Sequence, residues 1–166
     1  MFWFPKLKML LVNCLGKISR LMKFIFLLLI IVTTFISCKK DNVKGVIIGI
    51  NLIEHQSLSE NKRLDTIIKS TLKGNHNSLR RLNHFPCNGG ASCYDKGYII
   101  TQIIYKMKEN QFIQMVEKLD KKELYGIEEY IDTGLEYGDN DYDGKMDNKD
   151  FKNEFPTLYK IITEKK

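Results

Sequence analysis

The sequence predicts an all-α protein: a small helical domain that ends in a helix-loop-helix. Apolar residues recur at helical spacing in successive segments from residue 57 to the C-terminal part of the chain. Two motifs with the spacing of a capping box, Ser57-x-x-Glu60 and Asp120-x-x-Glu123, directly precede two of these segments. The 166 residues have room for one domain.

The first 37 residues differ in composition from the rest of the chain. They contain five of the 26 lysines and arginines and no carboxylate, so the remaining 21 cations stand against 20 carboxylates. The basic pI therefore comes from this leader. Because the residues after 37 have almost no excess of positive charge, the overall basicity of the chain does not support a nucleic-acid partner.

The leader contains an apolar run, Phe24–Ile36, of 13 residues that is interrupted by two threonines. A membrane-spanning helix needs about 20 apolar residues, whereas the core of a signal peptide needs about 7–15. Met22-Lys23 immediately precedes the run, so we expect either that Met22 is the true start or that residues 1–21 form a long basic extension. An uncleaved signal anchor and an ordinary secretory signal are the alternatives.

The segment Phe35-Ile36-Ser37-Cys38 resembles the lipobox of bacterial lipoproteins, with Phe35 where leucine is usual. The resemblance implies that residues 1–37 are a signal peptide, that Cys38 carries the lipid, and that 38–45 is a tether to the membrane. The resemblance also implies that the protein is located in the cell envelope of a bacterium. Lys39-Lys40-Asp41 is similar to a tag that sends some lipoproteins to the surface, so we expect the outer membrane or cell surface. Several acyl chains on one cysteine would hold the chain firmly.

Residues 46–166 form the predicted helical domain. The run Val46–Ile53 fits a buried helix or a strand, and a helix is slightly favoured. The capping box at Ser57 starts a helix that Gly74 ends. Asn77 or Ser78 can cap a short helix that Pro86 ends. The apolar positions of these two helices are Leu64, Ile67, Ile68, Leu72, Leu79, Leu82 and Phe85.

Three further segments, each with a stripe of apolar residues at helical spacing, complete the domain. The first follows residue 93; its isoleucines also suit a strand, but the spacing favours a helix. Asn110 can cap the second helix, and the capping box at Asp120 starts the third. The stripes are Ile100, Ile103, Ile104, Met107; Phe112, Ile113, Val116, Leu119; and Leu124, Ile127, Ile131, Leu135.

Residues 139–150 concentrate five carboxylates around one glycine, Gly144. Hard cations such as Ca²⁺ take six to eight oxygen ligands, and five unneutralised carboxylates in twelve residues would repel one another. An acidic, solvated turn is the alternative. The segment resembles an EF-hand loop, and 121–164 would be its helix-loop-helix. The resemblance implies one Ca²⁺ bound at the following positions: Asp139, Asp141, Asp143, the Lys145 carbonyl, Asp147 through water, and Asp150.

The loop departs from the EF-hand pattern in several respects. Asp150 replaces the usual glutamate, as in dockerin-like loops; Gly138 stands where a helical residue is usual; and Pro156 can break the leaving helix. Met146 takes the position of an apolar residue that faces the core. Because only one such loop is present, we expect a structural site of about 10⁻⁴–10⁻³ M affinity.

Cys87 and Cys93 enclose a glycine-rich segment of five residues. Outside the cytoplasm such a pair is expected to form a disulfide. The alternatives are a zinc site with His84, Cys87, Cys93 and His76, or a cysteine nucleophile with a histidine base. Asn88-Gly89-Gly90 lacks the lysine and Ser/Thr of a P-loop, so no organic cofactor is predicted.

Together these features predict a lipid-anchored envelope protein that holds one structural calcium ion and acts as a binding module rather than as an enzyme. Its partners would be the membrane, through Cys38, and an envelope or extracellular protein of unknown identity. Two other classes stay open. One is an envelope enzyme that uses Cys/His or carboxylate groups, and the other is an inhibitor or immunity-type lipoprotein.

Overall fold

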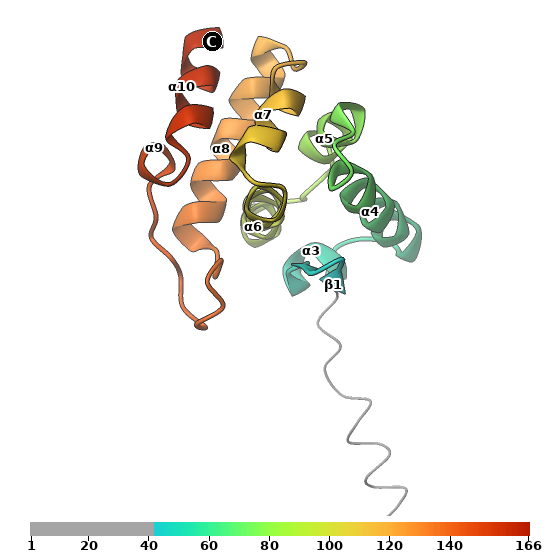
Figure 1. The fold of residues 1–166 in the computed structure, drawn as a ribbon. Helices are drawn as coiled ribbons and strands as arrows, with labels where there is room; N and C mark the ends of the chain where they lie inside the picture. Colours follow the sequence, from blue (N-terminus) through green and yellow to red (C-terminus); the bar gives the residue numbers. More distant parts are fainter. Residues whose placement is uncertain (1–41) are drawn as a thin grey trace, which may run out of the picture. The chain divides into compact units, whose positions relative to one another are not determined.

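A computed structural model describes residues 42–166 and confirms the predicted all-α class. The leader 1–37 and Cys38 lie outside the described residues. Figure 1 shows the described part as an assembly of helices with a small hairpin at one end, next to α3. Its elements are β1 (Asn42–Val43), β2 (Val46–Ile47), α3 (Ile50–Glu54), α4 (Leu58–Thr71), α5 (His76–Asn83), α6 (Gly90–Met107), α7 (Glu109–Val116), α8 (Lys121–Tyr137), α9 (Phe151–Glu154) and α10 (Pro156–Lys165).

The N-terminal boundary differs from the sequence prediction. Asn42–Val43 pairs with Val46–Ile47 in an antiparallel hairpin, so residues 42–45 belong to the folded part and not to a tether. The run Val46–Ile53 is divided between β2 and α3. The side-chain amide of Gln102 completes the hairpin: it donates to Ile47 O at 2.9 Å and accepts from Ile47 N–H at 2.7 Å.

The start of α3 is fixed by a residue far away in sequence. Gly49, the residue before this five-residue helix, offers no side chain to cap it. Instead the Asp95 carboxylate, from α6, accepts a hydrogen bond from Leu52 N–H at 2.9 Å. Burial raises the pKa of Asp95, and hydrogen bonds from Leu52 and Asn51 partly oppose that shift. A Cβ at Gly49 would lie only 2.0 Å from the Asp95 carboxyl carbon, so a larger residue there would displace this carboxylate.

Both predicted capping boxes are present. The Ser57 and Asp120 side chains each accept from the N–H three residues later, and Glu60 and Glu123 reciprocate. Two other cap predictions are wrong. Asn75, not Asn77 or Ser78, caps α5, and α7 begins after Lys108 (φ 66°) with no side-chain cap. Gly74 has φ +82°, which glycine adopts without strain.

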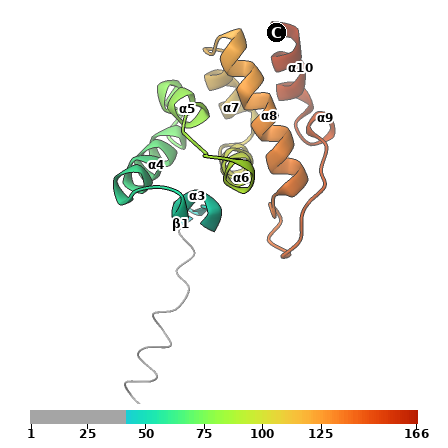
Figure 2. The same ribbon diagram turned by 180° about the vertical axis from the view of Figure 1, so that it is seen from behind.

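Helix α6 lies at the centre of the described part. Figures 1 and 2 show α4 and α5 on one side of it, α8 and α10 on the other, and α7 above it in both views. The segment that suited a strand as well as a helix is therefore one continuous helix. Ile99, Ile100, Ile103 and Ile104 are fully buried in a core to which all the predicted stripes contribute. None of the helices within residues 42–166 is long and apolar enough to cross a membrane.

The C-terminal helix-loop-helix has a divided second helix. Helix α9 ends at Glu154, and Pro156 occupies the first turn of α10, as the sequence suggested. Glu109 of α7 accepts a hydrogen bond from Leu158 N–H at 2.7 Å and so caps α10 from outside. Phe151, Phe155 and Leu158 are buried and attach this end of the chain to the core.

Candidate calcium site

The acidic loop connects α8 to α9 and turns back on the end of α8 (Figure 1). Helix α8 ends before Gly138, whose backbone is extended. The returning residues then donate backbone hydrogen bonds to the last carbonyls of the helix: Asp147 N–H to Gly138 O at 2.8 Å, Asn148 N–H to Glu136 O at 3.1 Å, and Lys149 N–H to Leu135 O at 3.0 Å. The loop thus satisfies carbonyl groups that a helix end otherwise leaves unpaired.

The structure brings together three of the predicted ligands. Asp139, Asp141 and Asp147 each offer a carboxylate oxygen, and these three oxygens lie within 4.8 Å of one another. Like charges at such distances repel unless a cation is shared between them. Carboxylate oxygens are the ligands that Ca²⁺ prefers, so the three residues fit this ion.

The surroundings of the Asp147 carboxylate are the most informative about whether this group binds a cation. Its side chain is only 1% exposed. Oδ2 accepts from Asn140 N–H at 3.0 Å and from Asn140 Nδ2 at 2.7 Å, and lies 3.4 Å from Lys149 Nζ. Oδ1 is buried and has no hydrogen-bond partner among residues 42–166. A buried carboxylate oxygen without a partner is costly, and a cation bound beside Asp147 would reduce that cost.

The first half of the loop has the geometry that a tight ligand loop needs. Gly144 has φ +84°, and its N–H donates to Asp139 Oδ1 at 3.2 Å. Asp143 N–H donates to Asp141 Oδ1 at 3.3 Å, and Lys145 N–H donates to Asp143 Oδ1 at 2.8 Å. Gly144 therefore has the left-handed conformation that its predicted position in the turn requires.

Two of the predicted carboxylate ligands are not part of the group of three. Asp143 has a half-exposed side chain that lies 3.9 Å from Lys145 Nζ. Asp150 is the N-cap of α9, where Oδ1 accepts from Asn153 N–H at 2.9 Å. Met146 is 59% exposed, so the expectation that it faces the core is wrong.

Residues of α6, which sequence reasoning missed, hold the start of the loop. Tyr98 Oη donates to Asp139 O at 2.6 Å, and Thr101 Oγ1 donates to Asn140 Oδ1 at 2.8 Å. Asn140 Nδ2 also donates to Gly134 O at 2.9 Å. Burial raises the pKa of Tyr98, and the nearby loop carboxylates add to this shift. The phenol therefore stays protonated as a donor to the loop.

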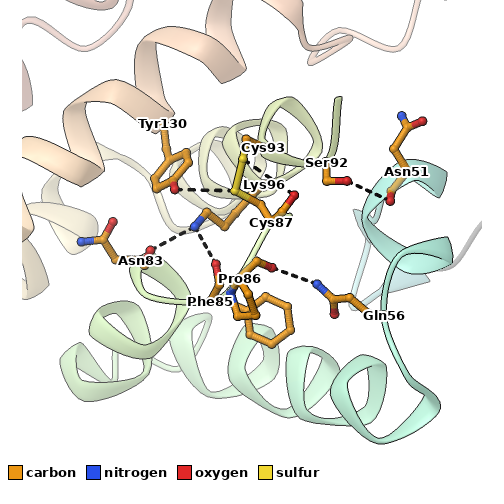
Figure 3. The surroundings of a disulfide bond; sticks show 10 residues. All are labelled: Asn51, Gln56, Asn83, Phe85, Pro86, Cys87, Ser92, Cys93, Lys96 and Tyr130. Carbon is orange, nitrogen blue, oxygen red and sulfur yellow. Dashed lines mark hydrogen bonds between the residues drawn. A yellow bond between two sulfur atoms is a disulfide. The ribbon is translucent and has the colours of Figure 1, made fainter. Parts of the chain in front are cut away.

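Cys87 and Cys93 form the predicted disulfide, shown in Figure 3. Because each sulfur is bonded to the other, neither is a thiolate for a zinc ion or a nucleophile. His84, from the zinc alternative, instead lies 3.6 Å from the Glu123 carboxylate through Nε2. The disulfide therefore contradicts the zinc site and the cysteine nucleophile.

Lys96, close to the disulfide, is a buried cation that sequence reasoning also missed. Its Nζ donates to Phe85 O at 2.7 Å and to Asn83 O at 3.0 Å, and lies 3.9 Å from the centre of the Tyr130 ring (Figure 3). Burial lowers the pKa of Lys96 to about 8. Its spacing to Ile100 and Ile103, four and seven residues later, was the available signal, because it places Lys96 on the buried stripe.

Comparisons with known proteins return no relative. No protein-family model matches the chain, and neither a curated protein nor a solved structure shows significant similarity to it.

Proposed function

We propose that the chain is a lipid-anchored protein of the bacterial cell envelope that holds one structural Ca²⁺ in loop 139–150 and serves as a non-enzymatic binding module. The observation that carries the calcium part is the buried side chain of Asp147, which has one unpartnered oxygen and lies close to the carboxylates of Asp139 and Asp141. Bound Ca²⁺ would neutralise these three charges and fix the loop between α8 and α9.

The anchor part rests on the sequence alone. The lipobox-like Phe35-Ile36-Ser37-Cys38 and the basic, apolar leader before it support lipidation of Cys38. An envelope location is also consistent with the Cys87–Cys93 disulfide, because disulfides persist in oxidising compartments. The same disulfide weakens the alternative of a cysteine-dependent enzyme. Carboxylate catalysis and an inhibitor-type lipoprotein remain as competing proposals.

Calcium binding is tested by calorimetric titration and thermal unfolding of the purified full chain. With a dissociation constant near 10⁻⁴ M, about 1 mM Ca²⁺ stabilises the fold by about 1.4 kcal/mol and raises the Tm by a few degrees. Asp141→Ala should abolish both signals. Asp65→Ala, which removes an exposed carboxylate of α4 that pairs with Lys69, should retain them. Absence of calcium heat in the unchanged protein would refute the site.

Lipidation is tested separately by labelling cells with a radioactive fatty acid. Cys38→Ala should abolish the label and leave an unprocessed precursor. Cys14→Ala, which removes the cysteine within the leader, should leave labelling intact. Label that persists in the Cys38 variant would refute the anchor without touching the calcium site.

A further inference from the structure

We propose that Asp147 ligates the calcium ion directly, that Asp150 does not, and that Lys149 is the neighbouring cation that opposes the binding of the ion. The inference rests on the proposed calcium site and assigns its ligands differently from the EF-hand pattern. It predicts which carboxylate can be removed without loss of binding and which lysine lowers the affinity.

The two oxygens of Asp147 have different roles. Oδ2 holds the loop together, because Asn140 donates to it from the backbone and from the side chain. Oδ1 has no partner in the described residues although the side chain is 1% exposed. A metal ion beside Oδ1 would satisfy this atom without breaking either bond from Asn140. Asp147 can therefore coordinate through one oxygen directly, with no intervening water.

Asp150 is already used elsewhere. Its Oδ1 accepts from Asn153 N–H and starts α9, which carries the buried Phe151. The group of mutually close carboxylates includes Asp139, Asp141 and Asp147 but not Asp150. Movement of the Asp150 carboxylate toward that group would strain the α9 cap. The aspartate at the last loop position is thus explained by helix capping, for which Asp is better suited than the longer Glu.

Lys149 is the cation nearest to Asp147. Its Nζ lies 3.4 Å from Asp147 Oδ2, and 5.6 Å from the centre of the Tyr105 ring. Its side chain is 29% exposed, so water screens this charge incompletely. The ammonium partly neutralises the carboxylates before an ion arrives and then repels that ion. Lys149 should consequently weaken calcium binding.

The experiment measures the Ca²⁺ dissociation constant of the full chain by calorimetry for four variants. Asp147→Asn should weaken binding by about tenfold or more, because a ligand charge is lost. Asp150→Asn should leave the constant within about twofold, since asparagine caps a helix as well as aspartate. Lys149→Met should tighten binding by about threefold, and Lys152→Met, which removes an exposed charge from α9, should have little effect.

The outcomes separate this inference from the calcium site itself. If the unchanged protein binds no Ca²⁺, the site and the inference both fail. If it binds, but Asp150→Asn abolishes binding and Asp147→Asn does not, the site stands and the ligand assignment is overturned. The Tm in EDTA checks the folding of each variant. If Asp147→Asn does not fold, Lys149→Met decides: tighter binding supports the inference, and unchanged or weaker binding overturns it.

Discussion

Gly97 of α6 and Gly134 of α8 meet backbone to backbone. A Cβ placed on Gly134 would lie 2.3 Å from Gly97 O, and one placed on Gly97 would lie 2.7 Å from Tyr130 O. Neither helix can carry a larger side chain at this point without moving the other. Because Thr101 and Tyr98 of α6 also contact the acidic loop, this approach sets the position of the candidate calcium site.

Gly134→Ala should therefore destabilise the protein by about 1–3 kcal/mol, although alanine is the better helix former. The new methyl group would meet backbone atoms that cannot yield. Urea unfolding measures the change. Gly90→Ala is the control, because a Cβ at Gly90, at the start of α6, meets nothing within 4 Å. Equal stability of the two variants would contradict the close approach.

Lys96→Met should destabilise the protein by about 1–3 kcal/mol at pH 7, since the carbonyls of Asn83 and Phe85 lose their lysine donor. Lys69→Met, which removes a lysine from an exposed ion pair on α4, should cost less than about 0.5 kcal/mol. Both variants are compared with the unchanged protein by urea unfolding.

The effect of Lys96 should also depend on pH. Its folded pKa of about 8 lies below the ordinary value of 10.5, so the unfolded chain binds more protons between these two pH values. The contribution of Lys96 to the free energy of unfolding therefore grows as the pH rises from 8 to 10. The difference between the unchanged protein and Lys96→Met should be larger at pH 10 than at pH 7; a difference independent of pH would contradict the shift.

The Cys87→Ser, Cys93→Ser double variant should lose only about 2 kcal/mol, because the two cysteines are six positions apart and close a short loop. The amides of Ser92 and Cys93, both bonded to Gly89 O, should exchange hydrogen faster as the start of α6 loosens. Denaturant unfolding and amide exchange check these two effects. Complete unfolding of the double variant would show that the disulfide holds more than this segment.

Asp95→Ala should cost about 1–2 kcal/mol, because α3 has no side-chain cap of its own and takes one from Asp95. Thermal unfolding provides the measurement. Asp65→Ala makes the same substitution at an exposed position, and its effect should stay within about 0.5 kcal/mol. If the two variants have the same Tm, the contact between Asp95 and α3 contributes nothing to stability.

Features that depend on neighbouring residues were predictable from the sequence. Each of the two capping boxes forms between residues of one four-residue segment, and each apolar stripe can be recognised within the sequence of a single helix. The acidic loop was recognisable for the same reason, because Gly144 and the carboxylates of Asp139 and Asp141 lie close together along the chain.

Features that depend on distant partners were not predictable in this way. The division of Val46–Ile53 into a strand and a helix is fixed by Gln102 and Asp95, more than 40 residues later. The separate roles of Asp147 and Asp150 depend on the path of the loop back to α8, which spacing alone does not specify. The contact of Gly97 with Gly134 likewise needs the packing of two helices.

The burial of Lys96 also changes its chemistry as an amine. Its side chain is 2% exposed and its nitrogen is held by two carbonyl groups. A water-soluble acylating reagent can reach this nitrogen only when α6 separates from the segment that ends α5. The rate of acylation of Lys96 in the native protein would therefore measure how often that contact opens. The exposed lysines should react much faster.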